Sequence, residues 1–543
     1  MKYNRYFVHR IQIALKNFTK YLALLLLAAT IGCAKRGTIT GGEKDTIPPT
    51  LLQSIPANFS KNFKGQSFKL VFDEYVKMKD VSKNLIISPP MKVEPIIMPS
   101  TASKVFTINI KDTLQPNTTY SFNFGQSLQD NNEGNPYSQF KYVFSTGDYI
   151  DSLSLGGRIK DAYSLKTDNF VSIMLYKVDS TYNDSIIYKQ PPRYITNTLD
   201  SLKTWRLENL KEGKYLLIAL KDNNNNKFDP KRDKIGFQKE YITIPNDTVY
   251  ELELFKEDVP FKAMKATLDA GNKLLLGYEG DPTDIKATLK NGQDVLQSVV
   301  TKVPDKDSVN IWFKPIKVDS LHLDISRADF KSEYWVKIKA QKKDTLTFKP
   351  NVSGTLPLRS KFVLEPSVPL VKFDETKISV TKKDSSAVAF TTKYDEFKRE
   401  FEIDFPKEPV EKYQIRILPG AFTDFYDAAN DSLTYKLSTK STAEYANIRV
   451  TLENVNRFPV MVELTNKNGD VMYSEYSESA TVIDFNSVDP ALYTLRLIYD
   501  DNKNKKWDSG NFLLKRQAEE VIYLPKEFQV RANWDWEQPF TLP

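Results

Sequence analysis

The stretch Tyr120-Ser-Phe-Asn-Phe124 alternates aromatic with small polar side chains, and it decides the fold expected for this chain. In an extended strand successive side chains point to opposite faces, so this stretch has one apolar and one polar face. The same alternation occurs at Phe68, Leu70 and Phe72, and it is typical of antiparallel sheets that bury one face. Turn sequences such as Pro116-Asn117 separate short, regularly spaced runs of this kind, as in β-sandwiches. We therefore predict an all-β chain of tandem antiparallel β-sandwiches.

Length and composition agree with several packed domains. At roughly 100–200 residues per domain, a chain of 543 residues holds more than one. A hydrophobic fraction of 41%, with 12% aromatic residues, is enough to fill hydrophobic cores and argues against disorder. Cys33 is the only cysteine. The chain therefore has neither an internal disulfide framework nor a thiolate metal site.

The amino-terminal segment combines a basic leader, a short apolar run and this single cysteine. No acidic residue precedes Cys33, and the apolar run YLALLLLAATI at 21–31 is shorter than the ~20 residues that cross a bilayer comfortably. This layout is typical of a secretory signal peptide, which we place at residues 1–32. An uncleaved anchor helix and an ordinary signal beside a chance cysteine are the alternatives.

The end of the apolar run, Thr30-Ile-Gly-Cys33, resembles a bacterial lipobox. Thr30 stands where leucine is usual. The resemblance implies that the Cys33 thiol is lipidated, that signal peptidase II cuts before it, and that palmitate or a similar acyl chain completes the anchor. Residues 33–44 would then be the lipidated tether. Two or more acyl chains hold a protein at a membrane where one alone does not.

Charge and histidine content restrict the function. Five of the seven net positive charges precede Cys33, which leaves about +2 for the mature chain, with no basic block that could follow phosphates. We therefore expect no nucleic-acid partner. His322 is the only histidine after the leader, so a His-rich zinc site is excluded. Its place in the alternating segment 320–325 predicts a solvent-facing strand residue.

Residues 45–147 resemble a bacterial Ig-like domain that is common in lipoproteins of the Bacteroidota. The resemblance implies an Ig-like β-sandwich in an extracytoplasmic setting, and it implies no activity, because the fold is a scaffold. The motifs that carry it are Asp45-Thr-Ile-Pro-Pro49, Phe72-Asp-Glu-Tyr75, Ile87-Ser-Pro-Pro90, Pro116-Asn-Thr-Thr-Tyr120, Asp130 to Pro136, and Phe144-Ser-Thr-Gly147.

A second domain type is expected at 152–257. It resembles the transthyretin-like or carboxypeptidase-regulatory-like β-sandwich through Gly156-Gly157 and through Leu210-Lys-Glu-Gly-Lys-Tyr215. Both domain types echo later in the same order, which predicts a second Ig-like sandwich at 351–440 and a second transthyretin-like sandwich at 441–543. We expect a β domain of uncertain type at 259–350.

Two Asp/Asn-rich loops are the candidate metal sites. In the first, Asp222, Asn224, Asn226, the Phe228 carbonyl and Asp233 occupy EF-hand-like positions 1, 3, 5, 7 and 12. Oxygen ligands on alternate residues can surround one Ca²⁺. The loop departs from that pattern because lysine replaces glycine at position 6 and position 12 is aspartate. The other interpretation is a structural turn, since asparagine tolerates a left-handed backbone.

The second loop follows the later echo. Asp500, Asn502 and Asn504 keep the alternate spacing, with Asp508 further along. Three lysines crowd this loop, and position 12 is the neutral Asn511. A structural turn is therefore favoured more strongly here than in the first loop.

Two other motifs suggest chemistry. Asp73 and Glu74 are adjacent on a strand and so point to opposite faces, which argues against a glycosidase carboxylate pair. Trp534 and Trp536 alternate with acidic residues and share one face. They are interpreted as packing residues, with a sugar-stacking platform as the alternative.

The function that these features favour is that of a non-enzymatic, lipid-anchored envelope scaffold. One alternative is an accessory lipoprotein of an outer-membrane assembly or secretion complex, with a β-barrel partner. Another is a glycan-binding or polysaccharide-processing lipoprotein. We expect attachment to the outer membrane. The basic residues Lys35 and Arg36, in place of the acidic residues that surface export favours, indicate the periplasmic face.

Overall fold

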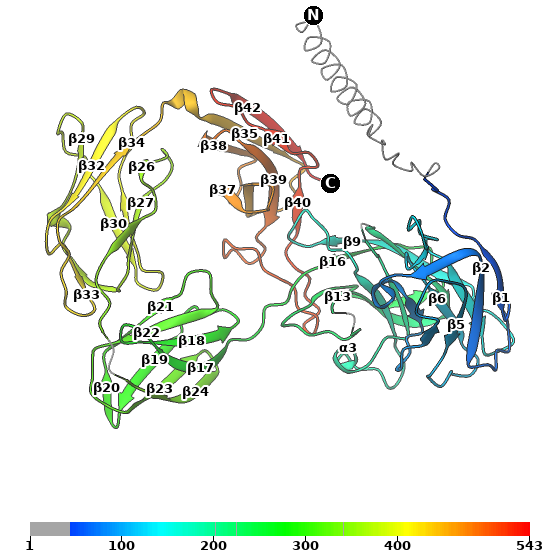
Figure 1. The fold of residues 1–543 in the computed structure, drawn as a ribbon. Helices are drawn as coiled ribbons and strands as arrows, with labels where there is room; N and C mark the ends of the chain where they lie inside the picture. Colours follow the sequence, from blue (N-terminus) through cyan, green and yellow to red (C-terminus); the bar gives the residue numbers. More distant parts are fainter. Residues whose placement is uncertain (1–43, 201, 224, 340–341) are drawn as a thin grey trace, which may run out of the picture.

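The computed structural model describes residues 44–543 except residues 201, 224, 340 and 341, and the regular secondary structure of this part is almost entirely β-strand. The strands form five groups, and in each group sheets pack around a hydrophobic cluster. We call these groups the first to fifth sandwiches, in chain order (Figure 1). The predicted all-β class is confirmed. Across the described ranges, no helix is both long and apolar enough to cross a membrane, and the leader and Cys33 lie outside them.

The first sandwich shows how alternation positions the strands. One sheet has the order β1-β2-β5-β4, with β7 pairing with the far end of β2, and the other has the order β3-β6-β8. Phe68, Leu70 and Phe72 are at most 1% exposed and point into the core, as the alternation predicts. The elements are β1 (Leu51–Ile55), β2 (Ser67–Met78), α2 (Val81–Asn84), β3 (Ile86–Ser88), β4 (Ile96–Met98), β5 (Ser103–Asn109), β6 (Thr119–Asn123), β7 (Leu128–Asp130) and β8 (Lys141–Ser145).

The second sandwich packs a three-stranded sheet against a five-stranded sheet. The orders are β12-β9-β16, with β16 parallel to β9, and β11-β10-β13-β14, with β15 also pairing with β13. The elements are β9 (Leu153–Asp161), β10 (Ser172–Lys177), α3 (Ile186–Lys189), β11 (Tyr194–Asn197), β12 (Thr204–Leu210), β13 (Gly213–Lys221), β14 (Lys234–Phe237), β15 (Ile242–Ile244) and β16 (Val249–Leu254).

The fifth sandwich repeats this topology strand for strand. Its sheets have the orders β38-β35-β42, with β42 parallel to β35, and β37-β36-β39-β40, with β41 also pairing with β39. The elements are η2 (Thr442–Glu444), β35 (Ala446–Glu453), β36 (Val460–Thr465), β37 (Val471–Ser477), β38 (Val482–Val488), β39 (Leu492–Tyr499), β40 (Val521–Tyr523), β41 (Phe528–Gln529) and β42 (Asp535–Thr541).

The fourth sandwich repeats the first. Its sheets have the orders β25-β27-β31-β30 and β26-β34-β32-β29, and the pair β28-β33 takes the place of the pairing between β2 and β7. The elements are β25 (Phe348–Pro350), β26 (Gly354–Thr355), β27 (Phe362–Pro366), β28 (Leu370–Phe373), η1 (Glu375–Lys377), β29 (Ile378–Lys382), β30 (Thr391–Asp395), β31 (Glu400–Asp404), β32 (Lys412–Ile417), β33 (Phe422–Asp424) and β34 (Leu433–Ser438).

The third sandwich differs from the other four. Two four-stranded sheets, β17-β18-β22-β21 and β20-β19-β23-β24, enclose its core. The elements are β17 (Lys262–Asp269), β18 (Lys273–Glu279), β19 (Lys286–Asn291), β20 (Asp294–Leu296), β21 (Ser298–Lys302), β22 (Ser308–Phe313), β23 (Ser320–Arg327) and β24 (Phe330–Lys337).

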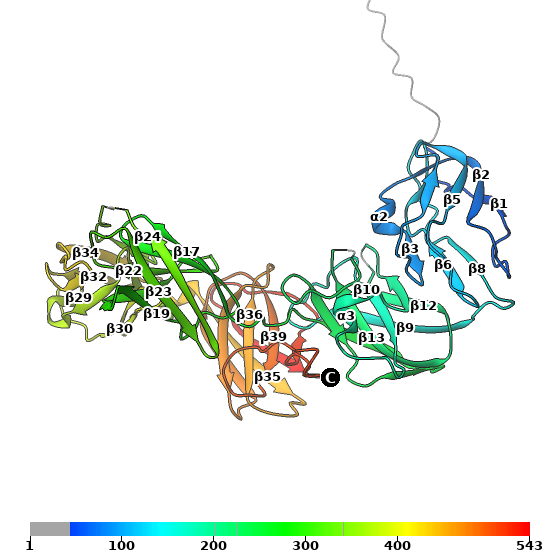
Figure 2. The ribbon, with the colours of Figure 1, turned by 90° about the horizontal axis from the view of Figure 1, so that it is seen from below.

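Polar contacts join each sandwich to the next, and the fifth also contacts the second. The second to fifth sandwiches thus form a closed ring, and the first is attached to the second (Figures 1 and 2). One contact at each junction, in chain order, is Lys211 Nζ to Asn117 O at 2.5 Å, Lys231 to Glu279 at 2.8 Å, Lys314 to Asp427 at 2.6 Å, Arg359 Nη1 to Asn486 O at 3.0 Å, and, closing the ring, Lys515 to Asp184 at 2.8 Å.

Candidate functional site

The junction that closes the ring is built by the segment between β39 and β40. Residues 507–518 of this segment, which we call the clasp, leave the fifth sandwich and lie on the outer face of the β11-β10-β13-β14 sheet. Phe512 of the clasp is fully buried there, and its ring meets that of Phe237 edge-on at 5.3 Å. A side chain at Gly510 would collide with the Phe255 ring at 2.4 Å, so only glycine fits this approach. The outer face of the second sandwich is therefore completed by residues of the fifth.

Polar groups of the clasp also pair across the junction. The Phe512 N–H donates to Glu257 Oε1 at 2.5 Å, and the Ser509 hydroxyl donates to the Lys256 carbonyl at 2.5 Å. Gln517 Nε2 donates to the Phe237 carbonyl at 2.9 Å. Each of these bonds joins residues more than 250 positions apart in the chain, so the sequence around either partner does not reveal them.

Arg496 forms a second contact beside the clasp. It points out of β39, opposite Glu463 of β36, and is only 1% exposed. Its guanidinium donates to Glu463 Oε2 at 2.7 Å, to the Tyr523 hydroxyl at 3.0 Å and to the Tyr163 hydroxyl at 2.6 Å. Tyr163 belongs to the second sandwich, and its ring centre lies 4.1 Å from the guanidinium carbon. A buried charge requires such a set of partners, so this site fixes the orientation of the two sandwiches.

Carboxyl groups gather at the same junction. Burial raises the pKa of Glu257, while the Phe512 N–H and the Arg516 charge lower it in part. Burial also raises the pKa of Asp258, and the nearby Asp508 charge raises it further. Burial raises the pKa of Glu519 in the same way, against the hydrogen bonds that it accepts from the main chain. The junction therefore holds acids whose charged form is disfavoured.

The first Asp/Asn loop follows β13 and folds onto its own main chain. Asp222 Oδ2 accepts a hydrogen bond from the Asn226 N–H at 2.7 Å, and Asp233 Oδ2 accepts one from the Asp229 N–H at 2.8 Å. Burial raises the pKa of Asp233, and the charge of Asp222 adds to this. Phe228 packs its ring into the cluster that also holds Phe512. Asn224 lies outside the described residues, and Ca²⁺ binding by this loop stays a prediction.

The second loop, after β39, takes the equivalent place in the fifth sandwich. Asp500 is fully buried and accepts hydrogen bonds from the N–H groups of Asn504 and Lys505, at 3.0 and 2.9 Å. The side-chain amides of Asn502 and Asn504 both donate to Asp508 Oδ2 at 2.7 Å. The carboxylate oxygens of this loop thus receive N–H donors from the loop itself. This geometry favours the interpretation as a structural turn.

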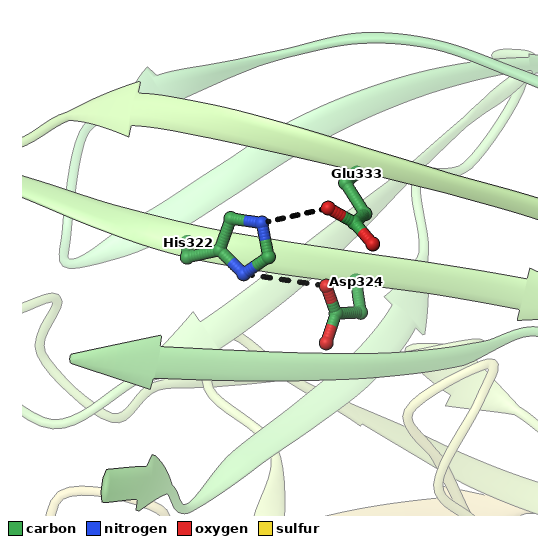
Figure 3. A group of neighbouring side chains, drawn as sticks. All are labelled: His322, Asp324 and Glu333. Atoms are coloured by element: carbon green, nitrogen blue, oxygen red, sulfur yellow. Dashed lines mark ion pairs between the residues drawn. The ribbon is translucent and has the colours of Figure 1, made fainter. Parts of the chain in front are cut away.

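His322 lies between two carboxylates on the outer face of the third sandwich (Figure 3). Its Nδ1 is 3.3 Å from Asp324 Oδ1, and its Nε2 is 3.3 Å from Glu333 Oε2. Asp324 also pairs with Lys290 at 2.6 Å. The side chain is on the face predicted for it, but it is only 17% exposed, because Trp335 covers it. Imidazole and carboxylates are metal ligands, and one such atom from each of the three residues lies within 4.8 Å of the others, although the two acids contact different ring nitrogens.

The two remaining sequence motifs have structural partners. Asp73 accepts hydrogen bonds from the main chain and hydroxyl of Thr50, at 2.8 and 2.6 Å, and these bonds lower its pKa. The rings of Trp534 and Trp536 stack at 5.5 Å, and Trp536 stacks in turn on Phe528 of the fifth core at 6.2 Å. This arrangement favours packing over a free platform for these two indoles.

A cleft of about 370 Å³ lies between the first and second sandwiches. Leu85, Ile87 and Met91 line it from the first sandwich, and Ile195 and Asn197 line it from β11. Its size falls in the range of ligand pockets, and junctions between domains are a common place for them.

Comparison with known proteins identifies one part of the chain. Residues 45–146 match the model of the bacterial Ig-like domain. No curated protein matches the sequence. Among solved structures, an S-layer protein, SbsC, is 13% identical over 88% of this chain and 67% of its own, with a TM-score of 0.16. The SGBP-B protein of a Bacteroides ovatus mixed-linkage glucan utilization locus, solved with a heptasaccharide, is 10% identical over 81% and 99%, with a TM-score of 0.17. At these scores the whole chains do not superpose.

Proposed function

We propose that this protein is a non-enzymatic, lipid-anchored scaffold of a bacterial envelope. Lipid on Cys33 would hold the chain at the outer membrane, and the tether would connect that anchor to the first sandwich. The five sandwiches would then present fixed surfaces to a partner. The bacterial Ig-like domain at 45–146 supports a scaffold role by analogy of fold alone, because one fold can carry many functions.

The observation that carries the proposal is the burial of Phe512 in the second sandwich. Domains joined only by short linkers are expected to move relative to one another unless their interface is large and apolar. Here a segment of the fifth sandwich completes the outer face of the second, and the buried Arg496 site adds a directional contact. Closing the ring in this way favours a protein that keeps its surfaces at fixed separations.

The repeated topology supports the finer assignment. The second and fifth sandwiches share one strand order, including the parallel pairs β9–β16 and β35–β42. We infer that both are transthyretin-like modules, that a unit of two domains was duplicated, and that the chain is a lipoprotein of the Bacteroidota. The partner that we propose is another envelope protein, with an outer-membrane β-barrel complex as the first candidate. The periplasmic face is the proposed location.

Catalysis is not part of this proposal. His322, the one histidine of the described ranges, is held between Asp324 and Glu333 rather than beside a nucleophile. The proposal therefore assigns function to surfaces and not to a reacting group.

The anchor can be tested by a Cys33→Ser variant expressed in the native envelope, with Ala34→Ser as the matched control. The proposal predicts that Cys33→Ser loses acylation and membrane retention, while the control keeps both. A stoichiometric envelope protein should co-purify with the wild type from detergent-solubilised membranes. Unchanged size, acylation and membrane retention of Cys33→Ser would contradict the anchor, and purification of the anchored protein without any partner would contradict the scaffold role.

A further inference from the structure

One tryptophan of the ring lies mostly in water. Trp335 of β24 is 71% exposed, whereas Trp205 and Trp312 on other strands are 5% and 1% exposed. An exposed indole offers a large apolar ring together with a polar N–H group, which is why tryptophan is enriched at binding surfaces. Trp335 belongs to the β20-β19-β23-β24 sheet of the third sandwich, where its side chain points away from the core.

The strand register places polar groups around this indole. Trp335 is the direct cross-strand neighbour of His322, and His322 in turn is opposite Lys290. The next row along the same face holds Asp324 opposite Glu333. We call these five residues the platform. It thus combines one exposed indole with a cation, two carboxylates and an imidazole.

The groups of the platform contact one another. The two nitrogens of His322 lie 3.3 Å from Asp324 and from Glu333, and its ring centre is 4.8 Å from that of Trp335. The indole therefore lies against the imidazole, while 71% of its surface stays exposed. Glu333 keeps 74% of its side chain exposed, so it can accept further hydrogen bonds from a ligand.

We propose that the platform is a carbohydrate-binding site. A sugar ring has an apolar C–H face that can stack on an indole, and a rim of hydroxyls that donate to carboxylates and accept from an amine. The platform places the exposed indole on the same face as the largely exposed carboxylate of Glu333, with the paired Lys290 and Asp324 beside them. This assignment goes beyond the scaffold role and does not depend on it.

The charges and the surroundings argue against other ligands. Asp324 and Glu333 would repel the phosphates of a nucleic acid or an anionic lipid. A protein partner would need apolar neighbours that exclude water around the indole. On this face, among the described residues, Val295 is the other large apolar side chain left mostly open, at 65% exposure, and it lies two strands beyond His322.

The platform is also open to a long polymer. Figure 2 shows β23 and β24 at the near side of the third sandwich, and Figure 1 shows the same strands at the lower edge, away from the other sandwiches of the ring. A polysaccharide chain could therefore pass across the sheet without meeting the rest of the ring.

Affinity gel electrophoresis of the full chain, solubilised in detergent, tests the site. The gels would contain hydroxyethylcellulose, mixed-linkage glucan, xylan, laminarin, galactomannan or mannan, with alginate as an anionic probe. We expect retardation by at least one neutral glycan. Trp335→Ala should weaken that binding at least tenfold, Trp335→Phe should retain part of it, and Glu333→Gln should weaken it without changing the melting temperature.

Trp534→Ala is the matched control, because that indole packs against Trp536. It should bind like the wild type. No retardation by any glycan of the panel would overturn the proposal, and so would binding that Trp335→Ala leaves intact or retardation by alginate alone. If Trp335→Ala unfolds, Trp335→Phe and Glu333→Gln decide, and unchanged binding in both would equally overturn it. Membrane retention and partner co-purification are separate measurements, so failure here leaves the scaffold proposal standing.

Discussion

Arg496 shows how a single residue can link two sandwiches. The strand 492–499 is otherwise mostly apolar, and a guanidinium in its middle must find partners or leave a charge buried. Glu463 supplies the opposite charge within the sheet, and Tyr163 supplies a hydroxyl from the second sandwich. The sequence signals that the strand contains a buried charge, but it does not identify a partner 333 positions away.

Removing the guanidinium should therefore destabilise the fifth sandwich strongly. Arg496→Ala leaves Glu463 buried and unpaired, so we expect a loss of about 3–5 kcal/mol in the free energy of unfolding of the fifth sandwich. Arg496→Met combined with Glu463→Leu removes both charges and should recover most of that loss. Denaturant unfolding of the three proteins at pH 7 measures the effect. A loss below about 1 kcal/mol for Arg496→Ala would show that the pair is not buried as described.

At the scale of elements, alternating and continuous apolar strands indicated different kinds of burial. Alternation at 68–72 predicted strands with one buried face, and β2 has one. The runs Tyr215-Leu-Leu-Ile-Ala-Leu220 and Leu492 to Tyr499 do not alternate, and β13 and β39 are buried on both faces. That continuous pattern was the available signal that another part of the chain covers these sheets. For the Asp/Asn loops after both strands, the sequence could not distinguish a Ca²⁺ site from a structural turn. The spacing of the residues does not say whether a carboxylate oxygen faces a cation or an N–H group.

The acids at the clasp make its docking depend on pH. The pKa of Glu257 is raised in the docked state, so its contribution to docking is fully present below its ordinary pKa and is lost as pH rises through the raised value. The pKa of Asp258 is raised in the same direction, by burial and by the charge of Asp508 in the clasp. We therefore expect the clasp to dock more firmly near pH 4.5, the ordinary pKa of a glutamate, than at pH 7.5.

Hydrogen exchange of residues 509–517, corrected for the intrinsic effect of pH, measures this dependence. Glu257→Gln keeps an acceptor for the Phe512 N–H and removes one titrating group. The protection of the clasp amides should therefore change less with pH in this variant than in the wild type. An equal or steeper change in the variant would rule out Glu257 as a source of the effect.

At the scale of the whole molecule, the ring follows from contacts between distant parts of the chain. Repeats in the sequence indicated the kinds of sandwich and their order, and the same strand orders recur in the structure. The third sandwich and residues 509–518 of the clasp provide the rest of the ring, and the repeats gave no signal for either. Which surfaces meet depends on shape and burial across more than 300 residues, and local periodicity carries no information about that.

The most direct test of the closed ring is a zero-length carbodiimide cross-link between Lys515 and Asp184, whose charged groups lie 2.8 Å apart. Lys361 and Glu402, also 2.8 Å apart but within the fourth sandwich, provide the internal control. Mass spectrometry of the monomer should find both cross-links in the wild type, and only the control in Phe512→Asp, because a buried carboxylate expels the clasp. A wild-type monomer that yields the control cross-link but never links Lys515 to Asp184 would contradict the ring.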